Sequence, residues 1–451
     1  MIARSSVAAL LMAVAMLSSL LIGIAPVAVA AAGLPASDAT VVQDRTDAAV
    51  LPTRSQASPA PSLAGGAWSA LMPWPLVAVH AALLRTGRVL VWDAWETGTV
   101  TARVWDPSTQ AFSSVFVNSQ IFCSGLAMLP DGRIIVVGGM AGPEAGIVDT
   151  NAFDPNTNQW STLDSMSVPR WYPAVQTLGD GRVLGLGGQS VQFTWADTPE
   201  IYSPTADQWS TLGVDTGDMH DAQYPMSFLL PDGNVYVMAI QLGIARNLNV
   251  VDQTWTDAGA LPERQGASAM YRPGKILYSG GGGSCIDCAS CPGSCDSVAT
   301  AFVTDRTQPN PAWRSTAAMS FPRENHTLVV LADGTVLAVG GSDNLATNSR
   351  TGPLAAELWD PGTEAWTTMA AMNVMRGNHS TAILLPDARV LVAGGGQEGT
   401  SIDQLNAEIF SPPYLFNGPR PTIAAAPTTT TYGASMTIST PDAANISSVS
   451  F

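Results

Sequence analysis

The sequence predicts an all-β protein built as a seven-bladed β-propeller. One phrase carries this prediction, because D-G-R-I-I-V-V-G-G at residues 131–139 returns along the chain with the same pattern. Further copies begin at residues 180, 232, 273, 333 and 387, and a weaker first copy begins at residue 86. Seven copies at a spacing of roughly 40–60 residues are typical of a propeller, in which each repeat is one sheet that stacks on its neighbours.

Each copy contains a turn, a strand and a glycine pair. Asp-Gly closes a tight turn, apolar and β-branched residues follow as a strand, and Gly-Gly lets neighbouring backbones approach. A second recurring element is a hairpin turn followed by a large aromatic, which is Phe112, Trp160, Trp209, Trp255 or Trp366. The 41 glycines and 32 prolines serve these turns, and no long amphipathic helical pattern interrupts them. We therefore expect one four-stranded sheet per repeat.

The chain is acidic but carries few charges. Its 36 Asp and Glu against 20 Lys and Arg give a net charge of −16, and only 12% of residues are charged. Proteins that bind nucleic acid present a basic face, so the composition argues against that partner. It fits a monomeric extracellular protein or one with a carbohydrate-side partner.

The N-terminus predicts export. An apolar run over 7–24 follows Arg4, and A-V-A at 28–30 supplies small residues at a cleavage position. This pattern is typical of a secretory signal peptide, here residues 1–30, and indicates a secreted protein of the extracellular space or cell envelope. The alternative is an uncleaved membrane anchor, because the run is near the minimum spanning length. We expect no membrane association after signal cleavage.

The remaining chain divides into three parts. Residues 31–66 are rich in Ala, Ser and Pro and predict a flexible leader. The repeats place the propeller at 67–418. Thr- and Ser-rich, strand-like sequence fills 419–451. About thirty residues cannot close a β-sandwich, so we expect a truncated second domain there.

Four of the five cysteines form a cluster: Cys285, Cys288, Cys291 and Cys295. Their spacing matches that of a bacterial ferredoxin iron–sulfur run. An exported chain, and Asp296 where that run has proline, favour two local disulfides instead. A zinc knuckle is the remaining alternative. Cys123 stands apart.

A common register gathers Cys123 with phenols and imidazoles. Nine residues before the turn glycine, or before Ala388 that replaces it, stand Cys123, Tyr172, Tyr224 and His379, and His326 lies eight before Gly334. An equal offset gives strand residues a shared direction, so we expect a ring at one end of the central channel. A thiol, two phenols and two imidazoles there indicate a metal or redox site. Each residue taken singly could simply fill the channel.

Four phrases resemble the galactose oxidase/glyoxal oxidase family of copper radical oxidases. They are F-C-S-G at 122–125, R-W-Y-P at 170–173, N-H-S at 378–380 and A-E-I-F-S-P-P-Y-L at 407–415. The glyoxal-oxidase-like branch is the more similar one, and the resemblance covers about residues 66–451. It implies a kelch-repeat propeller followed by an immunoglobulin-like C-terminal domain.

The resemblance also implies a site and an activity. Tyr172 would be an equatorial copper ligand joined through a thioether to Cys123, and this pair would be the radical cofactor. His379 would be a copper ligand. Copper suits nitrogen and oxygen donors and cycles by one electron. The family oxidises a primary alcohol or aldehyde hydrate and reduces dioxygen to hydrogen peroxide, so the partners would be dioxygen and a small aldehyde, alcohol or carbohydrate.

Asn378 is a departure from this family pattern. The family has tyrosine there, as axial ligand and general base, whereas an amide has no useful basicity. The family's second histidine ligand lies in a T-H-S phrase that would follow residue 451. Tyr224 or His326 could complete the ligand set, or form a different mononuclear copper site. The alternative function is a catalytically inactive kelch propeller that binds a carbohydrate or cell-envelope partner.

Overall fold

The computed structural model describes residues 63–94, 100–142, 145–191, 194–219, 223–282, 296–344, 351–397, 401–427, 435–446 and 449. The predicted signal peptide, nearly all of the predicted leader and the four clustered cysteines lie outside these residues. No helix in the described ranges is both long and apolar enough to cross a membrane.

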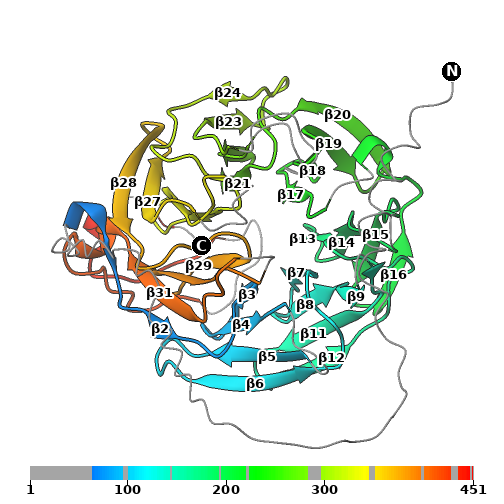
Figure 1. The fold of residues 1–451 in the computed structure, drawn as a ribbon, viewed down its shortest axis with the longest axis horizontal. Coiled ribbons are helices and arrows are strands. Elements are labelled where there is room, and N and C mark those ends of the chain that lie inside the picture. Colours follow the sequence, from blue (N-terminus) through cyan, green and yellow to red (C-terminus); the bar gives the residue numbers. More distant parts are fainter. Residues whose placement is uncertain are drawn as a thin grey trace, which may run out of the picture. The chain divides into compact units, whose positions relative to one another are not determined.

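Seven antiparallel sheets are arranged around one axis, which confirms the predicted propeller (Figure 1). The first three sheets hold β3 (His80–Leu83), β4 (Val89–Trp92), β5 (Val100–Trp105) and β6 (Phe112–Val117); β7 (Gly125–Met128), β8 (Ile134–Val137), β11 (Thr150–Asp154) and β12 (Gln159–Thr162); and β13 (Ala174–Thr177), β14 (Val183–Leu186), β15 (Glu200–Ser203) and β16 (Gln208–Thr211). The next three hold β17 (Met226–Leu229), β18 (Val235–Ala239), β19 (Ile244–Asn249) and β20 (Thr254–Ala260); β21 (Ala267–Arg272), β22 (Lys275–Ser279), β23 (Ala301–Asp305) and β24 (Arg314–Ser315); and β25 (Thr327–Val330), β26 (Val336–Val339), β27 (Ala355–Asp360) and β28 (Ala365–Ala371).

Both ends of the propeller sequence build the seventh sheet. It contains β29 (Ser380–Leu384), β30 (Val390–Gly394) and β31 (Asn406–Ser411), and β31 pairs with β1 (Ala67–Trp68) and β2 (Met72–Pro73). The Trp68 indole N–H also donates to the Ala370 carbonyl at 2.8 Å. Gly66 precedes β1 at φ +68°, where a Cβ atom would lie 2.5 Å from the Phe410 ring. Only glycine therefore lets β1 approach β31 closely enough to close the ring.

Outside the sheets, the described elements are short. They are the hairpin of β9 (Met140–Gly142) and β10 (Ala145–Gly146), and the 3₁₀-helices η1 (Leu63–Gly65), η2 (Gly217–Met219), η4 (Pro413–Phe416) and η5 (Ala443–Asn445). Beyond η4, one isolated bridge joins Ala425 and Ser439. The immunoglobulin-like domain at 419–451 stays a prediction.

The recurring phrases occupy equivalent places in every sheet. The strand after each Asp-Gly turn is the second of its sheet, and β4, β8, β14 and β26 are buried at all four residues. Both faces of this strand pack on neighbouring sheets, which explains its continuous apolar run. The predicted aromatics lie at the start of the outermost strands, as Trp366 does in β28.

Three buried arginine–glutamate pairs recur among the described residues. The nitrogen–oxygen distances are 3.0 Å for Arg170–Glu200, 3.0 Å for Arg323–Glu357 and 3.2 Å for Arg376–Glu408, and all six side chains have no exposure. Each arginine also donates to the first carbonyl of the glycine pair in its own sheet, as Arg376 does to Gly394 at 2.8 Å. A buried ion pair is stable only when such further hydrogen bonds satisfy its remaining polar atoms.

The same arginines join neighbouring sheets. The second glycine of the preceding glycine pair donates its N–H to the arginine carbonyl, at 3.0 Å for Gly139 to Arg170 and 2.8 Å for Gly341 to Arg376. The chain then turns into the innermost strand of the next sheet. Each pair therefore positions the residues directly before that strand.

We predict that replacing Arg323 by Met destabilises the protein by about 3–5 kcal/mol, because Glu357 would stay buried without its partner. Urea denaturation measures this loss. The matched control is Arg182→Met, which breaks the exposed Arg182–Asp180 pair and costs about 1 kcal/mol or less. Equal losses in the two variants would contradict the structural role of the buried pair.

Candidate active site

A ring of residues with left-handed backbone precedes the innermost strands. Cys123, Tyr172, Tyr224 and His379 have φ values of 54°, 63°, 43° and 59°. Two carboxamide residues, Gln265 at 57° and Asn325 at 52°, complete the described ring. Positive φ is uncommon outside glycine, and such strain is found where the surrounding structure holds a functional conformation.

The nine-residue offset holds in the structure with one change. In the repeat of Gly334, the residue nine before the turn is Asn325, and Asn325 has the left-handed backbone. His326 lies one residue further on, 6% exposed, and its Nε2 is 3.0 Å from the Ser279 hydroxyl. It is not among the residues that line the cavity below. The prediction that His326 belongs to the ring is therefore not supported, because its side chain contacts Ser279 and does not line the cavity.

The ring surrounds a cavity of about 670 Å³. This volume lies in the range of roughly 300–1,000 Å³ that small-molecule sites occupy. The lining includes Cys123, Tyr172, Tyr224, Asn378 and His379, and none of the described lining residues is Asp, Glu, Lys or Arg. The site is therefore suited to a small uncharged molecule.

Cys123, Tyr172 and Tyr224 are joined in sequence around the ring. The Tyr172 N–H donates to the Cys123 carbonyl at 2.9 Å, and the Tyr224 N–H donates to the Tyr172 carbonyl at 2.8 Å. The two phenol rings meet edge to face with centroids 4.9 Å apart, and the Trp171 ring lies 4.3 Å from the Tyr172 ring. All four side chains belong to one apolar cluster. Burial, with smaller effects of Cys123 and Tyr172, raises the pKa of Tyr224 well above its usual range, so this phenol stays protonated.

His379 is held in one orientation. Its Nδ1 lies 2.8 Å from the Gly396 carbonyl. Because a carbonyl only accepts, Nδ1 carries a proton, and in the neutral ring Nε2 then has the lone pair. Metal-binding histidines are commonly fixed in this way, with one ring nitrogen bonded to a carbonyl and the other left for the metal.

His80 is a site residue that the sequence analysis missed. It lines the cavity, stacks on Trp92 at 4.9 Å, and accepts the Cys123 backbone N–H on Nε2 at 3.1 Å. Burial, and to a smaller extent His379, lowers the pKa of His80 to about 3, so it stays neutral and an acceptor. The nine-residue offset does not select His80, because in the first repeat that offset reaches Ala78, two residues before it.

The donor set is one that copper can use. In the part of the chain that the structure describes, no three His, Cys, Asp or Glu side chains lie together as metal ligands do. Among the described residues, a metal with three or more protein ligands at this cavity would therefore need a ligand of another type, and Tyr172 offers a phenol. Tyr172 oxygen and His379 Nε2 are an oxygen and nitrogen pair of the kind that Cu(II) takes.

Comparisons with known proteins agree with this geometry. Residues 94–264 match the family model described as glyoxal oxidase N-terminus. A galactose oxidase of Gibberella zeae is 28% identical over 406 residues, which cover 82% of this chain and 58% of that protein. An aldehyde oxidase of Vitis pseudoreticulata is 26% identical over 82% of this chain and 80% of its own length. A solved fungal alcohol oxidase in complex with copper matches with a TM-score of 0.74 and 27% identity, over 84% of both chains.

These matches first indicate the class of fold, because the seven-bladed β-propeller is similar to that of a fungal alcohol oxidase solved with copper. The predicted resemblance to the galactose oxidase/glyoxal oxidase family is also confirmed, because the family model and the relatives named above come from that family. The chain spans 58% of the length of the Gibberella galactose oxidase that it matches.

We predict a pH-dependent stability that depends on His326. Burial, with a smaller effect of Arg323, lowers its pKa from 6.5 to about 3. Between these values the unfolded chain binds a proton that the folded protein excludes, so stability falls as pH falls from 6.5. The slope from one such histidine is about 1.4 kcal/mol per pH unit.

Denaturant midpoints of wild type and His326→Gln at pH 7.5, 6, 5 and 4 test this prediction. The variant should lose stability less steeply below pH 6.5, whatever its stability at pH 7.5. Parallel profiles would show that His326 does not exclude the proton.

Proposed function

We propose that this protein is a copper-dependent oxidase of the galactose/glyoxal oxidase type. It oxidises a small aldehyde or primary alcohol and reduces dioxygen to hydrogen peroxide. The observation that supports this function is the left-handed ring, which brings the Cys123 thiol, the Tyr172 phenol and the His379 imidazole to one cavity. Tyr172 and His379 would hold the copper, which would supply one-electron redox chemistry, and the Tyr172 phenol would supply the second electron.

The protein's own residues prepare the radical site. Cys123 Sγ forms a bond to a ring carbon of Tyr172, and the thiol hydrogen and the ring hydrogen leave. Their two electrons and two protons reduce dioxygen to hydrogen peroxide. The hydrogen bond of 2.9 Å from the Tyr172 N–H to the Cys123 carbonyl keeps these two residues adjacent, and the Trp171 ring packs against Tyr172. The resulting thioether makes the phenol easier to oxidise.

The cavity favours a neutral substrate with hydroxyl or carbonyl groups. Its lining carries amides from Gln241, Gln265 and Asn325, which donate and accept hydrogen bonds. An uncharged aldehyde, alcohol or sugar can hydrogen-bond to these amides. A charged substrate would be buried in this cavity without an opposite charge beside it. We further propose secretion, as the N-terminal sequence indicates, and a monomeric state.

A second candidate function is an inactive propeller that binds a carbohydrate or cell-envelope partner. Asn378 favours it, because this amide lies beside His379 on the cavity wall where the family has a phenol that acts as base. The amide lining would serve binding as well as it serves catalysis.

We predict a covalent link between Cys123 and Tyr172. Protein exposed to copper and air and then reduced with a thiol should have a mass two hydrogens below the sequence value, because reduction opens disulfides but leaves a thioether intact. The variants Cys123→Ser and Tyr172→Phe should show the full sequence mass. An alkylatable Cys123 thiol in the copper- and air-treated wild type would rule out the radical cofactor.

We also predict that Asn378→Tyr raises peroxide production about tenfold or more, since it restores a group that takes the substrate proton. A coupled peroxidase assay with small aldehydes and primary alcohols measures the effect. Asn378→Phe, which has a similar ring without the hydroxyl, is the control. An unchanged rate in a protein that contains the thioether would favour the binding function.

A further inference from the structure

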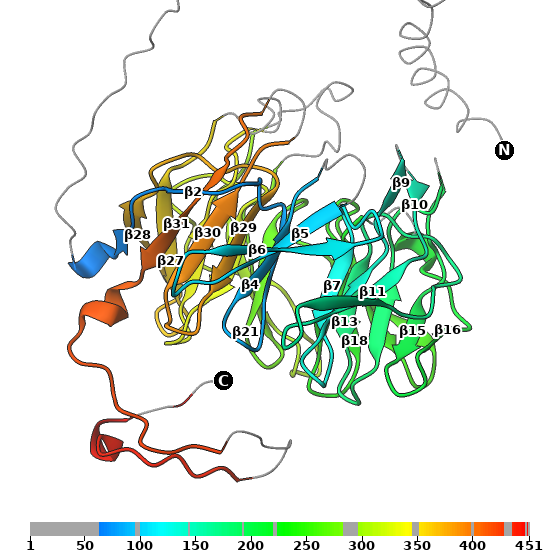
Figure 2. The same cartoon turned by 90° about the horizontal axis from the view of Figure 1, so that it is seen from below.

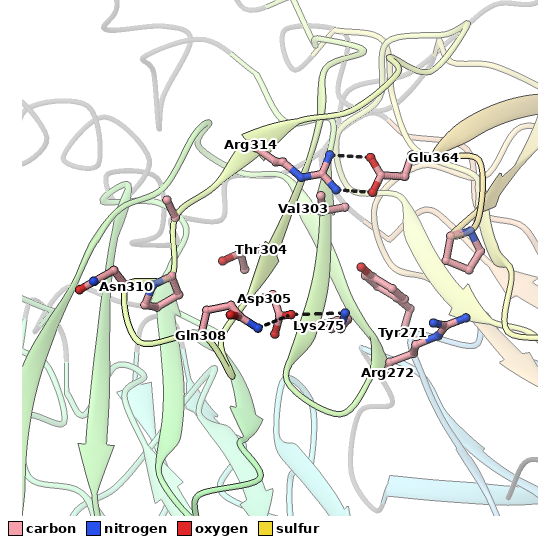
Figure 3. Close-up of a pocket in the computed structure, with 13 residues that line it drawn as sticks. Tyr271, Arg272, Lys275, Val303, Thr304, Asp305, Gln308, Asn310, Arg314 and Glu364 are labelled. Atoms are coloured by element: carbon pink, nitrogen blue, oxygen red, sulfur yellow. Dashed lines mark hydrogen bonds and ion pairs between the residues drawn. The ribbon is translucent and has the colours of Figure 1, made fainter.

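A second cavity, of about 440 Å³, lies at the other end of the fifth sheet (Figure 3). Strand β21 connects the two sites, because Gln265 before the strand lines the candidate active site and Arg272 at its end lines the second cavity. Seven residues of extended chain span about 20 Å. Seen from the side, the strands run between the two faces of the propeller (Figure 2), so the second cavity is separate from the active site.

Two ion pairs hold the walls of this cavity, and Figure 3 shows both. Lys275 Nζ lies 3.3 Å from Asp305 Oδ2 within the fifth sheet. Arg314 donates to Glu364 through its two terminal guanidinium nitrogens, with one contact of 2.5 Å, and so joins β24 to the turn before β28 of the sixth sheet. The walls thus come from two sheets, and the Arg314–Glu364 pair connects them at an exposed position.

Two hydroxyl groups line the cavity, and one of them has unused hydrogen-bonding capacity. Thr304 is 3% exposed, and its hydroxyl has no hydrogen-bond partner among the described residues. The Tyr271 hydroxyl lies between the two ion pairs in Figure 3. A buried hydroxyl without a partner is unfavourable, so a water or a ligand hydroxyl is expected beside Thr304.

The cavity also carries an excess positive charge. Three cations line it, Arg272, Lys275 and Arg314, against the two carboxylates of Asp305 and Glu364. The exposed Arg272 makes no ion pair with any carboxylate in the described ranges, so its charge is the uncompensated one. In a protein of net charge −16, this is a locally cationic place that favours an anion.

We propose that the second cavity binds a hexuronate sugar, either free or as a unit of an acidic polysaccharide. Its carboxylate pairs with Arg272, and its hydroxyls bind Thr304, Tyr271 and the carboxylate oxygens of the two ion pairs. Guanidinium groups bind carboxylates through paired, charge-assisted hydrogen bonds, which explains a preference over a neutral sugar. The proposal does not depend on the copper chemistry at the other site.

Isothermal titration calorimetry of the full chain with D-glucuronate, D-glucose and acetate tests the proposal. Glucuronate should bind about tenfold or more tightly than either glucose or acetate, because only it offers both the carboxylate and the hydroxyls. Arg272→Met should weaken glucuronate binding by about tenfold or more, and Thr304→Val several-fold. Arg85→Met removes the same charge from an exposed position on the first sheet and should have no effect.

Absent glucuronate binding, equal affinity for glucose or acetate, or an unchanged affinity in Arg272→Met would overturn the proposal. Thermal melting of the variants shows that each is folded. Oligogalacturonate distinguishes the two sources of the sugar. Tighter binding of the oligomer than of galacturonate, lost in Arg272→Met, supports a polysaccharide ligand, whereas equal affinity per sugar supports the free acid.

Discussion

The buried arginine–glutamate pair is the interaction on which the order of this propeller depends. Taking both charges out of water is costly, and further hydrogen bonds to the two charged groups offset much of that cost. Here each arginine binds its glutamate, the glycine-pair carbonyl of its own sheet and, through its own carbonyl, the glycine pair of the sheet before. One residue thereby closes a sheet and joins two sheets.

These pairs also connect stability to the candidate active site. Arg170 lies two residues before Tyr172 and Arg376 lies three before His379, so the two proposed copper ligands follow directly from anchored backbone. A left-handed conformation costs a tyrosine or histidine about 1–3 kcal/mol, and it persists only where neighbouring contacts determine it. The carbonyl contacts from Cys123 to Tyr172 to Tyr224 supply further support. The proposed copper site and the stability of the fold therefore rest on the same backbone network.

The sequence predicted the fold well because a propeller repeats its signals. Turn, apolar strand, glycine pair and outer aromatic each recur at one place per sheet, and Trp366 or Gly394 could be assigned from any other copy. The nine-residue count selected Cys123, Tyr172 and His379, which all line one cavity, and their roles in a copper site stay a prediction. The same count does not select His80, which contacts Cys123 from a different strand position. In the sixth sheet the residue at the ring position is Asn325, whereas the predicted imidazole was its neighbour His326. Pairs such as Arg323 and Glu357 link strands far apart in sequence, and no local pattern reports their contact. The second cavity could not be predicted either, because its walls come from two sheets whose residues lie far apart in the sequence.

The central claim is that one backbone ring places Tyr172 and His379 to hold a copper ion. Copper(II) titration followed by electron paramagnetic resonance and visible absorption tests it most directly, with wild type compared with Tyr172→Phe and His379→Ala. The account predicts one bound copper per wild-type chain, loss of the phenolate-to-copper absorption in Tyr172→Phe, and loss of a nitrogen hyperfine coupling in His379→Ala. Copper bound with unchanged affinity and unchanged spectra in both variants would contradict it.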